Sequence, residues 1–391
     1  MINFLDEAQE LFSYTRNLRR DLHMHPELGF MEVRTAEIVA KELGKLGMKV
    51  RTGIGQTGVV GLLEGKAPGP VILLRFDMDA LPVQELTGVE YASINPGVMH
   101  ACGHDGHVAI GLTVAQLLYK HKDEFSGTVK LIFQPAEEGL GGAERMIADG
   151  VLQDPKPDVA LGLHVWNEKP VGWWGIVPGP VMAAADKFTV RIIGKGGHGA
   201  VPNLTNDPIL AASQVINLLQ SIVSRNISPL NSAVVTVASI RGGDAFNVIP
   251  AEVELKGTIR TFEPAIRDLV TRRFTQIVED TARALNCSAQ IDLNMITPAV
   301  INHPDVTSRV QKVASSLLKG DDLDYKTITL GSEDMAFLFQ RVPGCYFFIG
   351  SANKDLQLDA PHHSANFNFD ESILPKAAGL MAASAIEFLV D

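Results

Sequence analysis

Three near-continuous apolar segments, separated by amphipathic ones, constrain the fold of this 391-residue chain most strongly. They are VILLRFDM (71–78), TVKLIFQ (128–134) and DVALGLHV (158–165). Their continuous apolar character predicts strands buried on both faces of a sheet. The spacing in 108–121 predicts an amphipathic helix between the first two strands, and helices are also predicted over 4–25 and 35–46. This alternation predicts an α/β fold in which helices cover both faces of a mixed sheet.

The pattern changes near residue 185. KFTVRIIGKGG alternates apolar and polar residues, as in a sheet with one wet face. Two helices (207–224 and 264–285) and three further alternating strands follow, which predicts a separate α+β unit with a four-stranded sheet. Helix and strand patterns of the first kind resume after TPAVINHPD. We therefore predict a discontinuous main domain (1–184 and 299–391) with an inserted domain (185–298).

Composition argues against several classes of partner. The chain has 34 Lys and Arg against 45 Asp and Glu, a net charge of −11, which disfavours binding to nucleic acid and to anionic membranes. No run of about 18 apolar residues is present, so no membrane span is expected. The N-terminus lacks the basic start and apolar core of a secretory signal. Three cysteines are too few, and odd in number, for a disulfide framework, so a cytoplasmic protein is expected.

Reactive side chains follow the predicted buried strands where each strand ends. In chain order they are Asp77 and Asp79, Glu137 and Glu138, and His164. Ligands of α/β sheets gather beyond the carboxyl ends of the strands, so these side chains are expected to share one site. Each signal also has an ordinary interpretation. A strand-end Asp is commonly a turn residue, and a buried His is commonly a hydrogen-bonded structural residue.

The segment GVMHACGHDGHVA (97–109) adds a cysteine and three histidines at the same edge. In a reducing compartment, Cys102 beside His104 indicates either a metal ligand or a nucleophile. A zinc finger would need a second close pair of ligands, which the sequence lacks. A thiolate, imidazoles and carboxylates together suit zinc or a similar divalent metal. They also leave a glutamate to take a proton from a water shared by two metals.

Eight motifs resemble those of the M20 metallopeptidase family. They are HACGHDGH, RFDMDALP, FQPAEEG, GLHV, GKGGHGA, FNVIP, GSEDMAF and PHHSANF, and RRDLHMHPELGF (19–30) fits as well. The nearest branch is the amidohydrolase group of aminoacylases, hippurate hydrolases, N-acetyl-diaminopimelate deacetylases and indoleacetyl-amino-acid hydrolases. The resemblance covers nearly the whole chain. It implies that the main domain is catalytic and that the inserted domain is a lid and dimerisation domain.

The resemblance implies a role for each residue that its motifs match. Glu137 matches the general base, and Cys102 matches the position that bridges two metals. His198 matches a lid histidine that holds the developing oxyanion in a neighbouring subunit's site. The implied metal ligands are Cys102, His104, Glu138, His164 and His363, where counting back from Phe367 selects His363 over His362. The implied substrate contacts are Asn247, Arg260 and Gly331, and Asp77 and Asp105 are expected to orient ligand histidines or Arg75.

The expected reaction is metal-dependent hydrolysis of the amide bond in an N-acyl amino acid. Two divalent ions per subunit are expected, drawn from zinc, manganese, cobalt or nickel. A metallocarboxypeptidase acting on short peptides is the first alternative, because the motifs do not separate the two. A cysteine-nucleophile hydrolase and a non-catalytic binding protein are alternatives of other classes, although an intact base argues against a pure binder. The resemblance also implies a homodimer or homotetramer assembled through the inserted domain.

Overall fold

The computed structural model describes residues 2–389, which divide into two compact units. Unit 1 contains Met1–Val181, Ile301–Ile328 and Asp334–Asp391, and unit 2 contains Met182–Val300 and Thr329–Glu333. The short segment Thr329–Glu333 joins unit 2 because Ala183 N–H donates to Gly331 O at 2.9 Å. The role of the inserted domain as a lid and dimerisation domain stays a prediction.

Unit 1 is built on one mixed sheet, as predicted. Across the described residues the sheet has eight strands in the order β1-β2-β4-β3-β5-β16-β6-β15. The central strands β4, β3, β5 and β16 run parallel, and β1 and β2 pair antiparallel beside them. The strands are β1 (Lys49–Ile54), β2 (Gly58–Glu64), β3 (Val71–Asp77), β4 (Thr128–Gln134), β5 (Val159–Pro170), β6 (Trp173–Gly175), β15 (Asp322–Asp324) and β16 (Gly344–Ala352).

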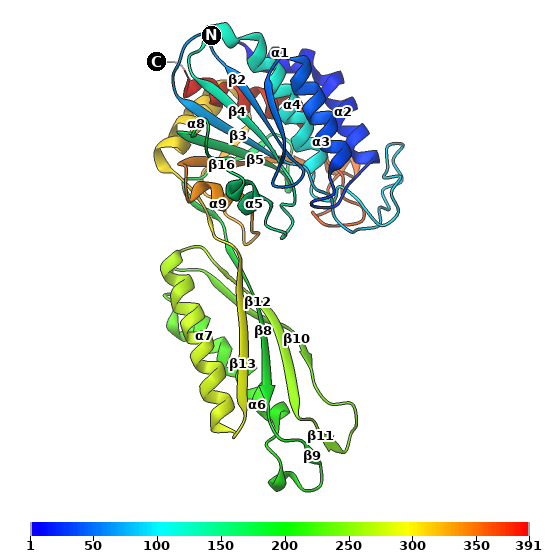
Figure 1. Cartoon of the computed structure of the whole chain (residues 1–391), viewed down its shortest axis with the longest axis vertical. Helices are drawn as coiled ribbons and strands as arrows, with labels where there is room; N and C mark the ends of the chain where they lie inside the picture. Colours follow the sequence, from blue (N-terminus) through cyan, green and yellow to red (C-terminus); the bar gives the residue numbers. More distant parts are fainter. Residues whose placement is uncertain (1, 390–391) are drawn as a thin grey trace. The chain divides into compact units, whose positions relative to one another are not determined.

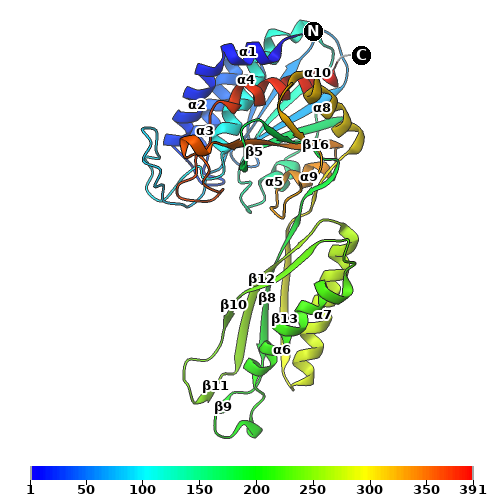
Figure 2. The same ribbon diagram turned by 180° about the vertical axis from the view of Figure 1, so that it is seen from behind.

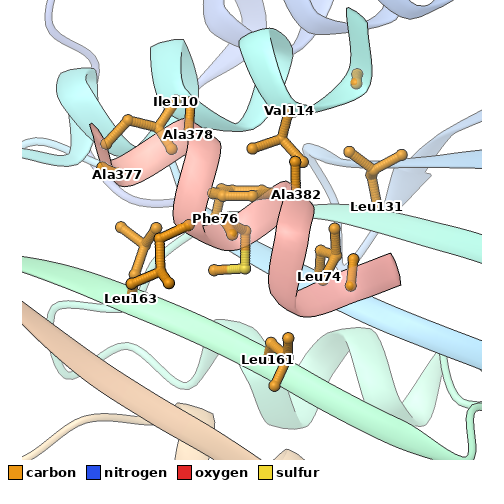
Figure 3. Packing of buried hydrophobic residues seen from close by; sticks show 14 of the residues in the cluster. Leu74, Phe76, Ile110, Val114, Leu131, Leu161, Leu163, Ala377, Ala378 and Ala382 are labelled. Atoms are coloured by element: carbon orange, nitrogen blue, oxygen red, sulfur yellow. The ribbon is translucent and has the colours of Figure 1, made fainter. Parts of the chain in front are cut away.

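Helices cover both faces of this sheet (Figure 1). Leu161 and Leu163 of β5 point to the face covered by the long helices, and Figure 3 shows them packed with side chains of α4 and α10. A side chain at Gly162, between them, would point to the other face of the sheet. Its Cβ would lie 3.4 Å from Cε of Met335 in α9. The helices are α1 (Phe4–Glu10), α2 (Phe12–Met24), α3 (Val33–Lys45), α4 (His104–Lys120), α5 (Gly142–Ala148), α8 (Pro304–Leu317), α9 (Met335–Phe339) and α10 (Ile373–Glu387).

One predicted helix is divided in the structure. The periodic segment 4–25 forms α1 and α2, which meet at Leu11. The first helix packs against α10 and the second against α4 (Figure 2). The apolar spacing is therefore correct, but the structure divides the segment into two helices at Leu11.

Unit 2 has the predicted four-stranded antiparallel sheet, in the order β10-β12-β8-β13. Along β8, Phe188, Val190 and Ile192 are buried and alternate with more exposed residues. Phe188 meets Phe274 of α7 with a ring-centroid distance of 4.6 Å, so the helices cover this face. The elements are β8 (Ala184–Ile193), α6 (Pro208–Ser221), β10 (Ala233–Arg241), β12 (Glu252–Thr261), α7 (Pro264–Ala284) and β13 (Ser288–Thr297).

Short elements complete the chain. They are β7 (Gly179–Met182), which pairs with β14 (Val300–Asn302), and β9 (Gly197–His198), which pairs with β11 (Val248–Ile249). Short helical turns cover Lys122–Glu124, Pro202–Leu204, Ile222–Asn226 and Lys354–Leu356. Within residues 2–389, none of the helices combines the length and apolar character needed to cross a bilayer.

Candidate metal centre

Unit 1 brings the five predicted metal ligands and Glu137 into one cluster. Within each of three overlapping groups, one potential ligand atom per residue lies within 4.8 Å of the others. The groups are Cys102, His104 and His164; Cys102, Glu138 and His363; and His104, Glu137 and Glu138. Because Cys102 belongs to two of these groups, its sulfur lies between a set with two histidines and a set with a carboxylate and a histidine.

A glycine at the start of α4 explains how Cys102 and His104 reach this cluster. Gly103 between them has φ 92°, a left-handed conformation that favours glycine. A Cβ there would lie 2.4 Å from Cγ2 of Val165, so the loop packs directly on β5 beside His164. The sequence C-G-H therefore places a thiol and an imidazole at the edge of the sheet, next to a strand-borne histidine.

The environment of the nitrogen ligands fits a cation. Nδ1 of His104 lies 2.9 Å from Asp79 O and 3.2 Å from Asp79 Oδ1, which fixes the proton on that nitrogen. Its Nε2 is buried and has no hydrogen-bond partner among residues 2–389. Burial and the neighbouring imidazoles hold the pKa of His164 well below its ordinary value, so this ring is neutral. Both histidines thus present a nitrogen suited to a metal.

The thiol and the carboxylate fit the same role. Burial raises the pKa of Cys102 well above its ordinary value, and Glu138 and Glu137 raise it further. A divalent cation is therefore needed to make this sulfur a thiolate. Oε1 of Glu138 is buried and pairs with Nε2 of His363 at 3.2 Å. These atoms form a ready set of donors for two divalent ions.

Spacing selected His363 of the two adjacent histidines in PHHSANF, and the structure gives the two rings different contacts. His363 faces Glu138 in the cluster. Nε2 of the neighbouring His362 instead accepts a hydrogen bond from Asn167 N–H at 3.1 Å. His107 is likewise used internally, since its Nδ1 contacts Asp77 at 2.5 Å and its Nε2 accepts from Val165 N–H. Both ring nitrogens of His107 are therefore engaged within the protein, whereas Nδ1 of His362 is buried and has no hydrogen-bond partner among residues 2–389.

Acidic residues around the cluster have supporting contacts that agree only in part with the sequence expectation. Asp77 contacts Arg75, as expected, and also His107. Burial would raise the pKa of Asp77, but His104, His107 and Arg75 hold it well below its ordinary value. Asp105 pairs with Arg19 and His23, each at 2.8 Å, and neither is a candidate ligand. Successive helical residues point about 100° apart, so Asp105 faces α2 while His104 faces the cluster.

Asp79, which the sequence analysis placed among the strand-end side chains without giving it a role, is a supporting residue of the cluster. Besides contacting His104, its Oδ2 accepts a hydrogen bond from Glu138 N–H at 3.0 Å. One carboxylate thus orients two candidate ligands. Its position in RFDMDALP, two residues beyond Asp77 at the end of β3, was the available signal.

Unit 2 carries the other predicted residues. His198 of β9 pairs with Val248 of β11, which places it beside Asn247. The His198 side chain is exposed, and its Nδ1 accepts a hydrogen bond from Ala200 N–H at 3.0 Å. The Arg260 guanidinium on β12 contacts Thr258 and Ile259 O. Gly331 N–H donates to Thr329 Oγ1 at 3.1 Å.

Comparison with known proteins identifies a family of peptidases, which agrees with the cluster of potential metal ligands. The model of peptidase family M20/M25/M40 matches residues 73–387. Hippurate hydrolase of Campylobacter jejuni is 37% identical over 393 residues, which span 99% of this chain and 100% of that protein. Thermostable carboxypeptidase 2 of Saccharolobus solfataricus is 39% identical over 387 residues, which span 98% of this chain and 97% of that protein.

The chain is also similar in structure to a peptidase that binds two metal ions. The YXEP protein of Bacillus subtilis, a dinuclear metal-binding peptidase from the M20 family, has a TM-score of 0.84 and 33% identity. The match spans 97% of this chain and 99% of that one. The clustered donors of unit 1 are residue groups able to hold two such ions. The chain therefore belongs to peptidase family M20/M25/M40 and is a metal-dependent hydrolase of amide bonds.

Proposed function

We propose that this chain hydrolyses the amide bond of N-acyl amino acids in unit 1, with Glu137 as the general base. The observation that carries the proposal is the position of Glu137, buried and grouped with His104 and Glu138. Cys102, His104, Glu138, His164 and His363 supply enough donors for two metal ions, which leaves Glu137 for proton transfer. Relatives named hippurate hydrolase and N-acetyl-L-cysteine deacetylase favour an acyl amino acid as the substrate.

In this proposal Glu137 transfers the proton, and His198 stabilises the negative charge that develops on the amide oxygen. When bound, two divalent metal ions polarise the amide carbonyl and lower the pKa of a shared water. Glu137 takes a proton from that water as it attacks the carbonyl, and later delivers the proton to the leaving amine. Cys102 would help to hold both ions, because it belongs to two of the three donor groups.

His198, Asn247, Arg260 and Gly331 are the proposed substrate contacts from unit 2. Because Nδ1 of His198 accepts from the backbone, its proton is on Nε2, so the exposed ring can donate a hydrogen bond. Such a donor is suited to stabilising an oxyanion. We further propose a homodimer or homotetramer assembled through unit 2, with His198 acting in the neighbouring subunit's site, and a cytoplasmic location.

The chemistry of Cys102 favours a metal ligand over a nucleophile. A nucleophilic cysteine needs a lowered pKa, whereas burial and the Glu138 and Glu137 carboxylates raise that of Cys102. A thiol enzyme would keep its activity in EDTA and lose it with iodoacetamide. The proposal predicts loss of activity in EDTA and recovery when a divalent metal is added.

Glu137→Gln is the direct test. Gln cannot accept the proton, so turnover is expected to fall by about 100-fold or more while two bound metals remain. Elemental analysis and the initial rate on acetyl- and benzoyl-amino acids measure these outcomes. Glu144→Gln, at an exposed position on α5, is the matched control and should keep native turnover. Near-native turnover of Glu137→Gln would show that the base is assigned wrongly.

A metallocarboxypeptidase is the second candidate function, because a relative of that name spans nearly the whole chain. Assaying dipeptides beside acyl amino acids separates the two. Higher kcat/KM on dipeptides would favour the peptidase. Mixing His198→Ala and Glu137→Gln subunits tests the shared site, since recovered activity requires a histidine and a base from different subunits.

A further inference from the structure

The loop that carries Glu137 begins with an unfavourable backbone conformation. Ala136, directly before the base, has φ 55° and is fully buried. Residues with a side chain rarely adopt this left-handed conformation, so the surrounding structure must hold it. The conformation at Ala136 sets the direction in which Glu137 leaves the end of β4.

A buried carboxylate from a distant part of the chain holds this residue. Oε1 of Glu32 accepts a hydrogen bond from Ala136 N–H at 2.9 Å. Its Oε2 accepts from Thr57 Oγ1 at 2.6 Å, and the residue has no exposed surface. Both carboxylate oxygens are therefore used, one of them by the backbone next to the proposed base.

The turn before Glu32 is also in close backbone contact with this loop. A Cβ at Gly29 would lie 3.0 Å from Ala136 Cα and 2.7 Å from Cδ1 of Leu140. A side chain at position 29 would require the neighbouring residues to shift, so glycine favours this close approach. The segment PELGFME thus packs directly against the loop that carries Glu137 and Glu138.

Capping of α3 does not account for Glu32. The first N–H groups of α3 are satisfied by another acid, since Glu27 accepts from Arg34 N–H at 3.0 Å and from Thr35 N–H at 2.9 Å. Glu32 makes no side-chain capping bond to this helix. The two glutamates therefore have different partners. Glu27 caps the start of α3, and Glu32 accepts a hydrogen bond from the loop that carries Glu137.

We propose that Glu32 is a positioning residue for catalysis: its carboxylate holds the backbone at Ala136 so that Glu137 faces the metal centre. This inference rests on the proposed function, because Glu32 acts through Glu137. Among the described residues, Glu32 is not part of the groups that could hold a metal ion. Loss of the carboxylate should therefore lower kcat without removing metal.

The first test compares Glu32→Ala with two other variants. Glu32→Ala should lower kcat by about 10- to 100-fold, as supporting residues of metal sites do, with KM little changed and two metals still bound. Glu32→Gln keeps an oxygen that accepts from Ala136 N–H and should recover most of this loss. Glu27→Ala removes the neighbouring cap of α3, so it should lower the melting temperature but leave kcat native.

A double mutant separates this inference from the proposed function. If Glu32 acts through Glu137, Glu32→Ala in a Glu137→Gln background causes little further loss, because the group that it positions is already absent. Native turnover of Glu137→Gln would overturn the proposed function and this inference with it. An inactive Glu137→Gln together with a native Glu32→Ala would overturn only the role of Glu32.

Three further results would also contradict the proposed positioning role of Glu32. They are a kcat loss in Glu32→Ala that Glu27→Ala matches, a loss that follows metal content, and full additivity in the double mutant. If Glu32→Ala does not fold, Thr57→Val removes only the hydroxyl that orients the carboxylate. A smaller kcat loss with unchanged metal is expected from that variant, and native kcat would contradict the inference.

Discussion

In the metal-free protein, Cys102 is expected to be a neutral thiol and His104 a protonated, positively charged imidazolium. Burial and nearby carboxylates raise the pKa of Cys102, and Asp77 and Asp79 raise that of His104 to about 10 even though burial opposes them. A metal ligand must be deprotonated, so binding has to expel these protons. The affinity for metal is therefore expected to rise with pH.

Calorimetry of metal binding tests this at the scale of single residues. Titrating zinc into chelator-stripped protein at pH 7, in buffers of different ionisation enthalpy, should report release of about two protons. Cys102→Ser should release about one proton fewer and bind less metal. The control is Cys287→Ser, because that cysteine is part of the core of unit 2 and should leave proton release native. Unchanged release in Cys102→Ser would remove this residue from the ligand set.

At the scale of elements, a buried ionic network ties α2 to the ligand loop. Arg19 donates to Asp105 Oδ2 at 2.8 Å and to Asn368 Oδ1 at 2.8 Å. His23 lies 2.8 Å from Asp105 and 3.2 Å from Glu85. The network joins the residue after His104 to the segment after His363, so it fixes two ligand-bearing segments against α2.

His23→Gln should reveal this network through the pH dependence of stability. Asp105 and Glu85 raise the pKa of His23 above its ordinary 6.5, despite burial and Arg19. The contribution of protonated His23 to the free energy of unfolding is therefore complete below pH 6.5. It is lost as the pH rises through the pKa of His23 in the folded state. His23 and other hydrogen bonds lower the pKa of Glu85 from 4.5 despite burial, so its contribution is lost at acid pH.

Urea denaturation between pH 4 and 9 measures the effect. The free-energy difference between wild type and His23→Gln should be roughly 1–3 kcal/mol near pH 5.5 and should shrink toward pH 9. His25→Gln, at the same end of α2 but outside the network, is the control. A difference that grows with pH would contradict the assigned charge on His23.

At the scale of the whole molecule, two separate cores predict two unfolding transitions. One core contains the sheet of unit 1 with α4 and α10, and the other contains Phe188 and Phe274 of unit 2. All five proposed ligands belong to unit 1. Bound metal should therefore stabilise only one transition, by about 2.7 kcal/mol at a free concentration of 100 times Kd.

Differential scanning calorimetry with and without EDTA checks this expectation. EDTA should lower the melting temperature of one transition and leave the other in place. Phe274→Ala should destabilise the EDTA-insensitive transition by about 3–5 kcal/mol, because it opens a cavity in the core of unit 2. A single transition that moves as a whole in both experiments would show that the two units unfold together.

Local sequence was sufficient for much of the fold and most of the metal cluster. The apolar runs identify β3, β4 and β5. Glu137 and Glu138 follow the end of β4 as expected, whereas β5 continues to Pro170, so His164 lies within its strand and not at the end. These inferences succeed because strand periodicity and the position of a site at strand ends are local properties of the chain. Counting residues within PHHSANF selected His363 over His362, and this selection stays a prediction.

Tertiary structure decided which residues support the cluster. The hydrogen bond from Ala136 to Glu32 joins residues 104 positions apart, and that from Glu138 to Asp79 joins residues 59 apart. Asp105 faces α2 for a similar reason, since its partners come from elements packed on α4. The sequence by itself determined most of the elements, because the period of apolar residues encodes them, and the resemblance of its motifs implied the donor residues. Only packing determined which buried acid meets which backbone N–H, because such contacts depend on how distant segments come together.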